Sequence, residues 1–279
     1  MSQVDLHIHS TASDGKYSPA EVVRMAEAGG LKYIAICDHD SVDGVSAAQT
    51  EADQHPGMTV FPGVEINTDT AIGELHILGY FVDLANAELA VTLERLRNSR
   101  IQRAQKMIDK LWKVGIHLDY DQIKQIAGEG SVGRPHVAQA MLEKGYINSL
   151  KEAFNKYIGR GGPAYVERDK ITPQEASQLI LRADGIPVLA HPLTCVDPEP
   201  ILRELATAGL KGLEVYYGGY SVEQVEGLLK LARKYGLLAT GGSDFHGLDS
   251  QNEPALGSVD IPLECAESLV AAAGRGQKG

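Results

Sequence analysis

Cysteine is scarce in this sequence, and long apolar runs are absent from it. The three cysteines, Cys37, Cys195 and Cys265, are widely spaced and form no CxxC motif, so we predict neither a disulfide framework nor a thiolate metal site. They are expected to be small buried hydrophobic residues in a reducing cytoplasm. No apolar run approaches the roughly 20 residues of a membrane helix. The N-terminus shows no basic stretch followed by an apolar segment, which favours a cytoplasmic protein without membrane association.

Positive charge is also in short supply. The 26 lysines and arginines are outnumbered by 37 aspartates and glutamates, which gives a formal net charge of −11. This balance argues against a protein that holds long nucleic acid by bulk electrostatics. Carboxylates that bind divalent cations would invert the local field, so small anionic substrates remain compatible with the composition. No obligatory protein partner is predicted.

Short apolar runs typical of strands alternate with helical patterns at both ends of the chain. The expected strands are residues 4–10, 33–37, 58–66, 73–82, 186–190, 212–217 and 237–241, with a candidate last strand at 257–261. The expected helices between them are residues 19–28, 42–54, 173–182, 198–208 and 221–235. Six or seven parallel strands with crossover helices predict an α/β barrel or a wound sheet, which the sequence alone does not separate.

The alternation stops in the middle of the chain. Residues 87–114 show a long pattern with apolar positions near a 3.6-residue period, and shorter helical pieces follow at 120–127, 135–143 and 150–158. We therefore expect a helical insertion over residues 98–165 that shapes the substrate pocket. The barrel is expected to be discontinuous, comprising residues 1–97 and 166–279.

Histidines and carboxylates gather where the apolar runs end. His7 and His9 lie two residues apart on the first expected strand, and Asp244 and His246 follow the last, so each pair shares one face. Further candidates at comparable positions are Asp14, His39, Glu65, His76 and His191. Imidazole and carboxylate, without thiolate, are the ligands of catalytic Zn, Mn or Fe, and β/α folds build active sites at strand ends. This pattern predicts a multi-metal hydrolase.

The ordered motifs HIHS, ICDHD, GVEI with the downstream His76, LAHP and GGSDFHG resemble the PHP (polymerase and histidinol phosphatase) family of phosphoesterases. The resemblance implies an irregular seven-stranded β/α barrel with two to three divalent metal ions (Mn, Fe or Zn) at the C-terminal mouth. It also implies the ligand sets: His7, His9, Glu65 and Asp244 for one ion; the bridging Glu65 with His76 and His191 for a second; and Asp14, His39 and His246 for the third. Apart from His76, which is expected only as a ligand, these are also the expected catalytic residues.

Phosphoryl transfer suits such a centre. Two ions bridged by a carboxylate lie about 3.5–4 Å apart and lower the pKa of a water between them from 15.7 to about 7, so hydroxide forms at neutral pH. Metal ions also stabilise the charge on the phosphoryl oxygens. Asp5, Asp38 and Asp40 are candidates to orient the histidines through their other ring nitrogen, although a role in turns or caps is equally open for each.

The expected insertion carries candidate substrate contacts. Residues 128–133 spell GxGxxG, but no strand precedes them, so we do not interpret them as a dinucleotide motif. Arg134, just before Pro135 at a predicted helix start, could grip phosphate bidentately. Arg160 offers a second cation on a glycine loop, and His136 could assist Arg134 or simply pack. The alternative for both arginines is an ordinary surface position.

The long helical pattern is rich in cations. Between residues 94 and 113, only two acidic residues accompany seven basic ones, which are Arg95, Arg97, Arg100, Arg103, Lys106, Lys110 and Lys113. We interpret this stretch as a solvated helix face, with guidance of a polyanion as the alternative.

The leading hypothesis is a metal-dependent phosphoesterase for a small nucleotide with two anionic ends. The resemblance implies a nucleoside 3′,5′-bisphosphate that loses its 3′-phosphate, or short RNA trimmed from a 5′-phosphate end, by attack of a metal-bridging hydroxide. Histidinol-phosphate phosphatase activity is the alternative within the family. C–N hydrolysis of the amidohydrolase type and an inactive metal-binding module are the alternatives outside this chemistry.

Overall fold

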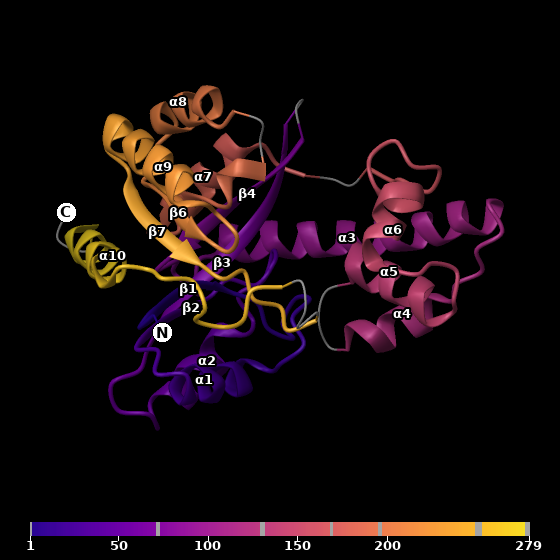
Figure 1. Ribbon diagram of the computed structural model, residues 1–279, viewed down its shortest axis with the longest axis horizontal. Helices are drawn as coiled ribbons and strands as arrows, with labels where there is room; N and C mark the ends of the chain where they lie inside the picture. The colour runs from indigo at the N-terminus through magenta and orange to yellow at the C-terminus, as the bar shows by residue number, and fades with distance from the viewer. Residues whose placement is uncertain are drawn as a thin grey trace.

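The computed structural model describes residues 2–70, 73–128, 132–167, 170–194, 197–248 and 253–276, and consists of a barrel and a helical lobe connected by one long helix (Figure 1). Cys195, the middle of the 128–133 loop and the end of the GRGQKG tail lie outside the described residues. Cys37 and Cys265 are buried, as expected for small hydrophobic residues.

Seven strands form one sheet in the order of the chain. They are β1 (Val4–Ile8), β2 (Tyr33–Ile36), β3 (Thr59–Thr70), β4 (Gly73–Tyr80), β5 (Ile186–Leu189), β6 (Gly212–Tyr217) and β7 (Leu238–Gly242). All residues of β1 and β5 are buried. The apolar run IPVL of β5 is typical of a strand covered on both faces, whereas β1 (VDLHI) also buries the polar Asp5 and His7.

The sheet curls into a nearly closed barrel because the chain after β7 pairs with β1. Asp244 N–H donates to the His7 carbonyl at 2.9 Å, and His9 N–H donates to the Phe245 carbonyl at 2.9 Å. Gly242 permits this approach, since a Cβ built there would lie 2.1 Å from the Cβ of His7. Of the two predicted architectures, the structure adopts the barrel.

The prediction that the strands are all parallel was wrong for the middle of the sheet. The pairs β3–β4 and β4–β5 are antiparallel, whereas the other neighbouring strands run parallel. Only two residues separate β3 from β4, and a crossover between parallel strands takes about a dozen residues or more. A hairpin is therefore the only connection that the sequence allows here.

Helices cover the barrel, and their starts follow local sequence signals. They are α1 (Pro19–Ala28), α2 (Val45–Ala52), α7 (Pro173–Arg182), α8 (Glu199–Thr207), α9 (Val222–Tyr235) and α10 (Leu263–Gly276), with a short 3₁₀ turn at Pro192–Thr194. Capping boxes begin three of them, with Ser18, Thr172 and Ser221 as the caps. The helix expected from residue 42 begins instead at Val45.

The C-terminal part of the chain differs from the sequence prediction. Residues 257–261 form no strand, and Gly257 adopts a φ of +69°. The segment from Leu263 forms helix α10, which we did not predict. Its Ala266 and Leu269 pack in one apolar cluster with Leu6 of β1, so this helix is stabilised by burial against the barrel.

The helical lobe contains an apolar core of its own. Helix α3 (Ala87–Lys113) extends from the barrel into the lobe, which also contains α4 (Tyr120–Ala127), α5 (Arg134–Glu143), α6 (Leu150–Ala153) and the π-helical turn η1 (Phe154–Ile158) (Figure 1). One cluster of buried apolar side chains is drawn entirely from the segment between Ala104 and Val166. Among the described helices, none is both long and apolar enough to cross a membrane.

Candidate metal centre

Glu65 of β3 lies at the centre of a cluster of histidines. Its side chain is fully buried. Ring nitrogens of five histidines lie within 3.5 Å of its two carboxylate oxygens: His76 at 2.7 Å, His39 at 2.7 Å, His191 at 3.2 Å, His9 at 3.4 Å and His7 at 3.5 Å. A carboxylate shared among so many imidazoles has the donor set of a bridging metal ligand.

A first group of donor atoms forms where β1 meets the end of β7. His9 Nε2 lies 3.0 Å from Asp244 Oδ1, and His7 Nε2 lies 3.4 Å from the same oxygen. His7 lies on β1 and His9 directly follows it, so the two histidines are two residues apart along the chain. Together with Glu65, these residues place one donor atom each within 4.8 Å of one another.

A second group involves Asp14, in the loop after β1. Its Oδ1 lies 3.4 Å from His246 Nε2, and its Oδ2 lies 3.9 Å from His39 Nε2. The other ring nitrogen of His9, Nδ1, is 3.8 Å from Asp14 Oδ1. Asp14 Oδ1 is buried and makes no hydrogen bond within the described part of the chain, which is the state of an oxygen that a bound cation would satisfy.

The third group brings His76 of β4 and His191, just after β5, to the far side of Glu65. The nitrogens His76 Nδ1 and His191 Nε2 are 3.2 Å apart. His39 also belongs to this group, because its Nδ1 faces Glu65. The structure thus brings all nine candidate ligands of the sequence analysis into one cluster at a single end of the barrel.

Positive backbone φ angles mark the same place. Asp40, His191 and Asp244 adopt φ values of 51°, 25° and 56°. Such values are costly for residues with a side chain, and they persist where the surrounding structure holds them. The His191 N–H, for example, donates to the buried carboxylate of Glu214 at 2.6 Å. Phe81 and Asp184, which do not belong to the cluster, also adopt positive φ values, so three of the five such residues in the described part of the chain lie at this site.

The electrostatics of the cluster are dominated by burial and by the close mixture of imidazoles and carboxylates. Burial opposes the protonation of His7 and His246, but the adjacent carboxylates outweigh it and hold both pKa values well above the usual range. Burial together with the neighbouring His246 and His39 lowers the pKa of His9 to about 3. Burial likewise works against ionisation of Glu65, yet the histidines around it hold its pKa well below the usual value.

Glu214 of β6 is a site residue that the sequence analysis missed. Its carboxylate is buried, and its Oε1 lies 3.0 Å from Nδ1 of His7. This contact favours a proton on Nδ1 and leaves Nε2 of His7 to face Glu65 and Asp244, as metal-binding histidines are commonly oriented. The signal was a single carboxylate in the apolar run GLEVYY, where a charge has no reason to be buried without a partner.

Two of the aspartates considered for this orienting role accept hydrogen bonds from loop residues instead. Asp5 accepts hydrogen bonds from the N–H groups of Ser243 and Gly257, both at 2.9 Å. Asp38 accepts from Ser10 N–H at 2.8 Å and from Ser13 Oγ at 2.6 Å. Asp5 and Asp38 therefore stabilise turns, which was the alternative role considered for them. They position the loops that carry the candidate ligands rather than the imidazole rings.

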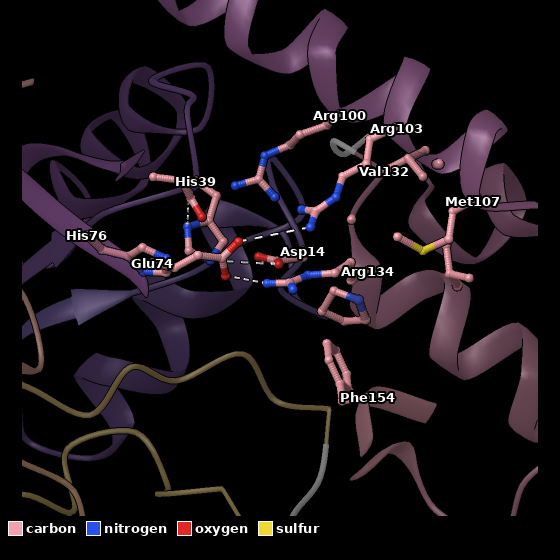
Figure 2. A pocket seen from close by; sticks show the side chains of 15 residues that line it. Asp14, His39, Glu74, His76, Arg100, Arg103, Met107, Val132, Arg134 and Phe154 are labelled. Carbon is pink, nitrogen blue, oxygen red and sulfur yellow. Dashed lines mark hydrogen bonds and ion pairs between the residues drawn. The ribbon is translucent and has the colours of Figure 1, made fainter. Parts of the chain in front are cut away.

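A cavity of about 180 Å³ opens beside the cluster, between the barrel and the helical lobe (Figure 2). His39, His76 and Asp14 line its end at the barrel. Side chains of the lobe, including Met107 and Phe154, line the other end. The cavity is therefore polar and rich in imidazole on one side and apolar on the other.

Two arginines of α3 form part of the wall of this cavity. Arg100 and Arg103 are each only 8% exposed, and Figure 2 shows both reaching into the cavity. Arg100 Nε donates to Asp40 at 2.9 Å, whereas Arg103 Nε donates to the Val166 carbonyl at 2.8 Å. The prediction of a solvated helix face was therefore wrong for these two residues, because α3 turns this side toward the barrel. Asp40 thereby orients an arginine.

The predicted substrate contacts take different positions. Arg134 at the start of α5 lines the cavity, pairs with the carboxylate of Glu74 and stacks over Phe154, with 5.6 Å from guanidinium carbon to ring centre. His136 is buried, and its Nδ1 accepts the Gly133 N–H at 3.0 Å, which completes the N-terminus of α5. Arg160 is exposed and is not among the residues that line the cavity.

Residues 5–184 match the model of a known protein family. That model is described as the PHP domain. A 5′-3′ exoribonuclease of Haemophilus influenzae is 35% identical over 246 residues, covering 87% of this chain and 89% of that protein. A 3′,5′-nucleoside bisphosphate phosphatase of Chromobacterium violaceum is 30% identical over 272 residues, covering 95% of this chain and 94% of that protein.

Two solved structures resemble the whole chain. A candidate metal-dependent phosphoesterase from Bifidobacterium adolescentis superposes with a TM-score of 0.88 at 27% identity, covering 97% of this chain and 96% of that one. An amidohydrolase from Chromobacterium violaceum, solved with bound sulfate and no metal, superposes with a TM-score of 0.86 at 30% identity and the same coverage. Both alignments include the helical lobe as well as the barrel, because they cover nearly the entire chain.

Proposed function

The chain belongs to the PHP domain family, and from this premise we propose that it removes the 3′-phosphate of nucleoside 3′,5′-bisphosphates or trims short 5′-phosphorylated RNA. It is a hydrolase of phosphoric esters. The observation that carries the proposal is the buried Glu65, whose two oxygens face five histidine rings. The relatives named for a bisphosphate phosphatase and an exoribonuclease support the substrate class.

Divalent metal ions fit this donor set. Imidazole nitrogens and carboxylate oxygens surround Glu65, and the buried Asp14 Oδ1 lacks a hydrogen bond among the described residues. We propose two to three ions of Mn, Fe or Zn, held by the following residues: His7, His9, Glu65 and Asp244; Glu65, His76 and His191; and Asp14, His39 and His246. Such ions supply a water activated at neutral pH and neutralise charge on the phosphoryl oxygens.

Two side chains of the barrel orient the proposed metal ligands. Glu214 fixes His7 in the tautomer that presents Nε2 to the centre. Tyr217 donates its hydroxyl to Asp244 Oδ2 at 2.8 Å, which leaves Oδ1 toward His7 and His9. We propose that these contacts keep the donor atoms in place before substrate arrives, so that little reorganisation accompanies the reaction.

The arginines of the cavity would bind the second phosphate of the substrate. Arg100, Arg103 and Arg134 project into the same cavity as His39 and His76, so a ligand could contact the metal cluster and the cations together. Guanidinium groups recognise phosphate oxygens bidentately. The apolar end, with Met107 and Phe154, is suited to a nucleobase, since bases stack on aromatic faces. We propose Arg160 as a peripheral contact only.

The lobe formed by residues 98–165 would shape this pocket as an inserted unit, with residues 1–97 and 166–279 as the catalytic barrel. Its separate apolar cluster supports this division. The same cations disfavour histidinol phosphate, because its amine is itself positively charged and the Glu74 carboxylate beside them is already paired with Arg134.

Metal analysis of the purified protein followed by a panel of phosphoesters tests the proposal. We expect metal in the protein as isolated, and phosphate release from adenosine 3′,5′-bisphosphate or mononucleotides from short 5′-phosphorylated RNA. Histidinol phosphate should be a poor substrate. Turnover of histidinol phosphate without turnover of the nucleotides would refute the substrate assignment. Metal-loaded protein that cleaves no phosphoester would refute the activity, and release of amine or ammonia without phosphate would indicate amidohydrolase chemistry.

A further inference from the structure

Glu74 of β4 places a carboxylate among the cations of the cavity. It lies two residues before His76 on the same strand, so the two side chains share one face. Glu74 pairs with Arg134 and lies 4.0 Å from Arg103 NH2 (Figure 2). It also lies 2.8 Å from Lys170 Nζ. Its own side chain remains 30% exposed, whereas the side chains of Lys170 and Arg103 are 5% and 8% exposed.

The cations around Glu74 have other contacts that hold their positions. Arg103 Nε donates to the Val166 carbonyl, and Arg134 stacks over Phe154. The adjacent Arg100 is anchored through Asp40. Arg100 NH2 is nevertheless buried at the cavity and has no hydrogen-bond partner among the described residues. This arrangement is preorganised for an anion with several acceptor oxygens, and the Glu74 carboxylate itself satisfies part of this demand.

We propose that Glu74 is a specificity-determining residue that competes with the distal phosphate of the substrate for the cations of the cavity. Its carboxylate pairs with these cations until a phosphomonoester displaces it. The identity of that substrate rests on the function proposed above. A phosphomonoester carries about −1.5 to −2 charges near pH 7 and three strong acceptor oxygens. It can therefore replace a single carboxylate at several cations. An anion with one charge and two oxygens replaces the Glu74 carboxylate less effectively. The same competition favours release of the product.

Binding of inorganic phosphate measures this competition without turnover. The whole chain is freed of metal with a chelator and titrated with phosphate in a calorimeter, as the native chain and as Glu74→Gln. We expect the variant to bind phosphate at least about tenfold more tightly, which corresponds to about 1.4 kcal/mol. The matched control is Glu88→Gln, which removes an exposed ion pair with Arg182 on the barrel and should leave phosphate affinity unchanged. Unchanged or weaker binding in Glu74→Gln would overturn the proposal.

A second variant, Glu74→Asp, tests the competition even if Glu74→Gln folds poorly. Glu74→Asp keeps the charge but withdraws it by one methylene, so its phosphate affinity should lie between the native and Glu74→Gln values. Arg134→Met should also cost more phosphate affinity in the Glu74→Gln background than in the native chain, because native Arg134 is already engaged by Glu74. Equal costs in both backgrounds would contradict the competition.

The kinetic consequence separates this proposal from the function on which it rests. In metal-loaded protein, Glu74→Gln should lower KM for a 3′,5′-bisphosphate and lower the inhibition constant of phosphate, without raising kcat. A purely structural role for Glu74 would raise KM instead. If no substrate is turned over by any variant, the proposed function fails, while the calorimetric comparison still decides the role of Glu74.

Discussion

The barrel and the helical lobe contribute different chemistry to the same cavity. The barrel supplies imidazoles and carboxylates from its strands and from the segments after them. Strands β1, β3 and β4 carry His7, the central Glu65 and His76. The lobe and its long helix supply guanidinium groups and apolar side chains. Apart from Glu74 of β4, the side chains proposed to select the substrate therefore come from a different part of the molecule than the proposed metal ligands. We expect the two sets to respond separately to mutation.

The largest expected effect is that of Glu65→Gln in the barrel. The amide cannot bridge cations as the carboxylate does, so we expect activity to fall by at least 10²–10³-fold, the usual cost of losing one preorganised electrostatic group. Metal content measured by elemental analysis should fall as well. Retention of both full metal content and activity would show that Glu65 is not the centre of the site.

Glu214→Gln should have a smaller effect through His7. The amide no longer favours the proton on Nδ1 as strongly, and loss of such a supporting carboxylate typically costs 10–100-fold in metal affinity or activity. Titration of metal into the metal-free protein measures the metal affinity. Glu51→Gln, on the barrel but remote from the cluster, should behave as the native chain. Identical metal affinity in both variants would remove Glu214 from the site.

The pH dependence of metal binding should follow from His7 and His246. Nearby carboxylates hold both pKa values well above the usual range, so these imidazoles carry protons near neutral pH in the metal-free protein. Metal binding must displace those protons. Affinity should therefore rise with pH, by up to about tenfold per pH unit for each proton released. Calorimetry in buffers of different ionisation enthalpy counts the protons, and a count of zero would contradict this account.

The smallest of these effects is expected in the lobe. Arg103→Met keeps most of the packing of the side chain but removes a cation from the cavity. We expect KM for a nucleoside 3′,5′-bisphosphate to rise by about tenfold with little change in kcat, since a charged hydrogen bond contributes about 1.5–3 kcal/mol. Lys113→Met, at the exposed end of the same helix, is the control. A fall in kcat with KM unchanged would place Arg103 in the reacting centre and erase the contrast between the two regions.

Much of the barrel and of the candidate site could be predicted from local patterns. The strands were recognisable because buried runs such as YIAI are apolar throughout, and three barrel helices begin at capping boxes visible in the sequence. The nine candidate ligands lie in short motifs on the strands or in the segments that follow them, and they converge in the structure. Helix α10 was not predicted from the sequence, because its alanine-rich segment is stabilised by packing against the barrel.

Residue type and spacing within a few positions were enough to predict the seven strands and the side chains that could hold metal. Only the tertiary structure decided that Arg100 and Arg103 face the cavity, that Glu214 supports His7 from 207 residues away, and that Glu74 lies among cations from three other segments. These relations depend on how the barrel closes and on how α3 packs against it. Such contacts join residues that are distant in the chain and leave no periodic signal.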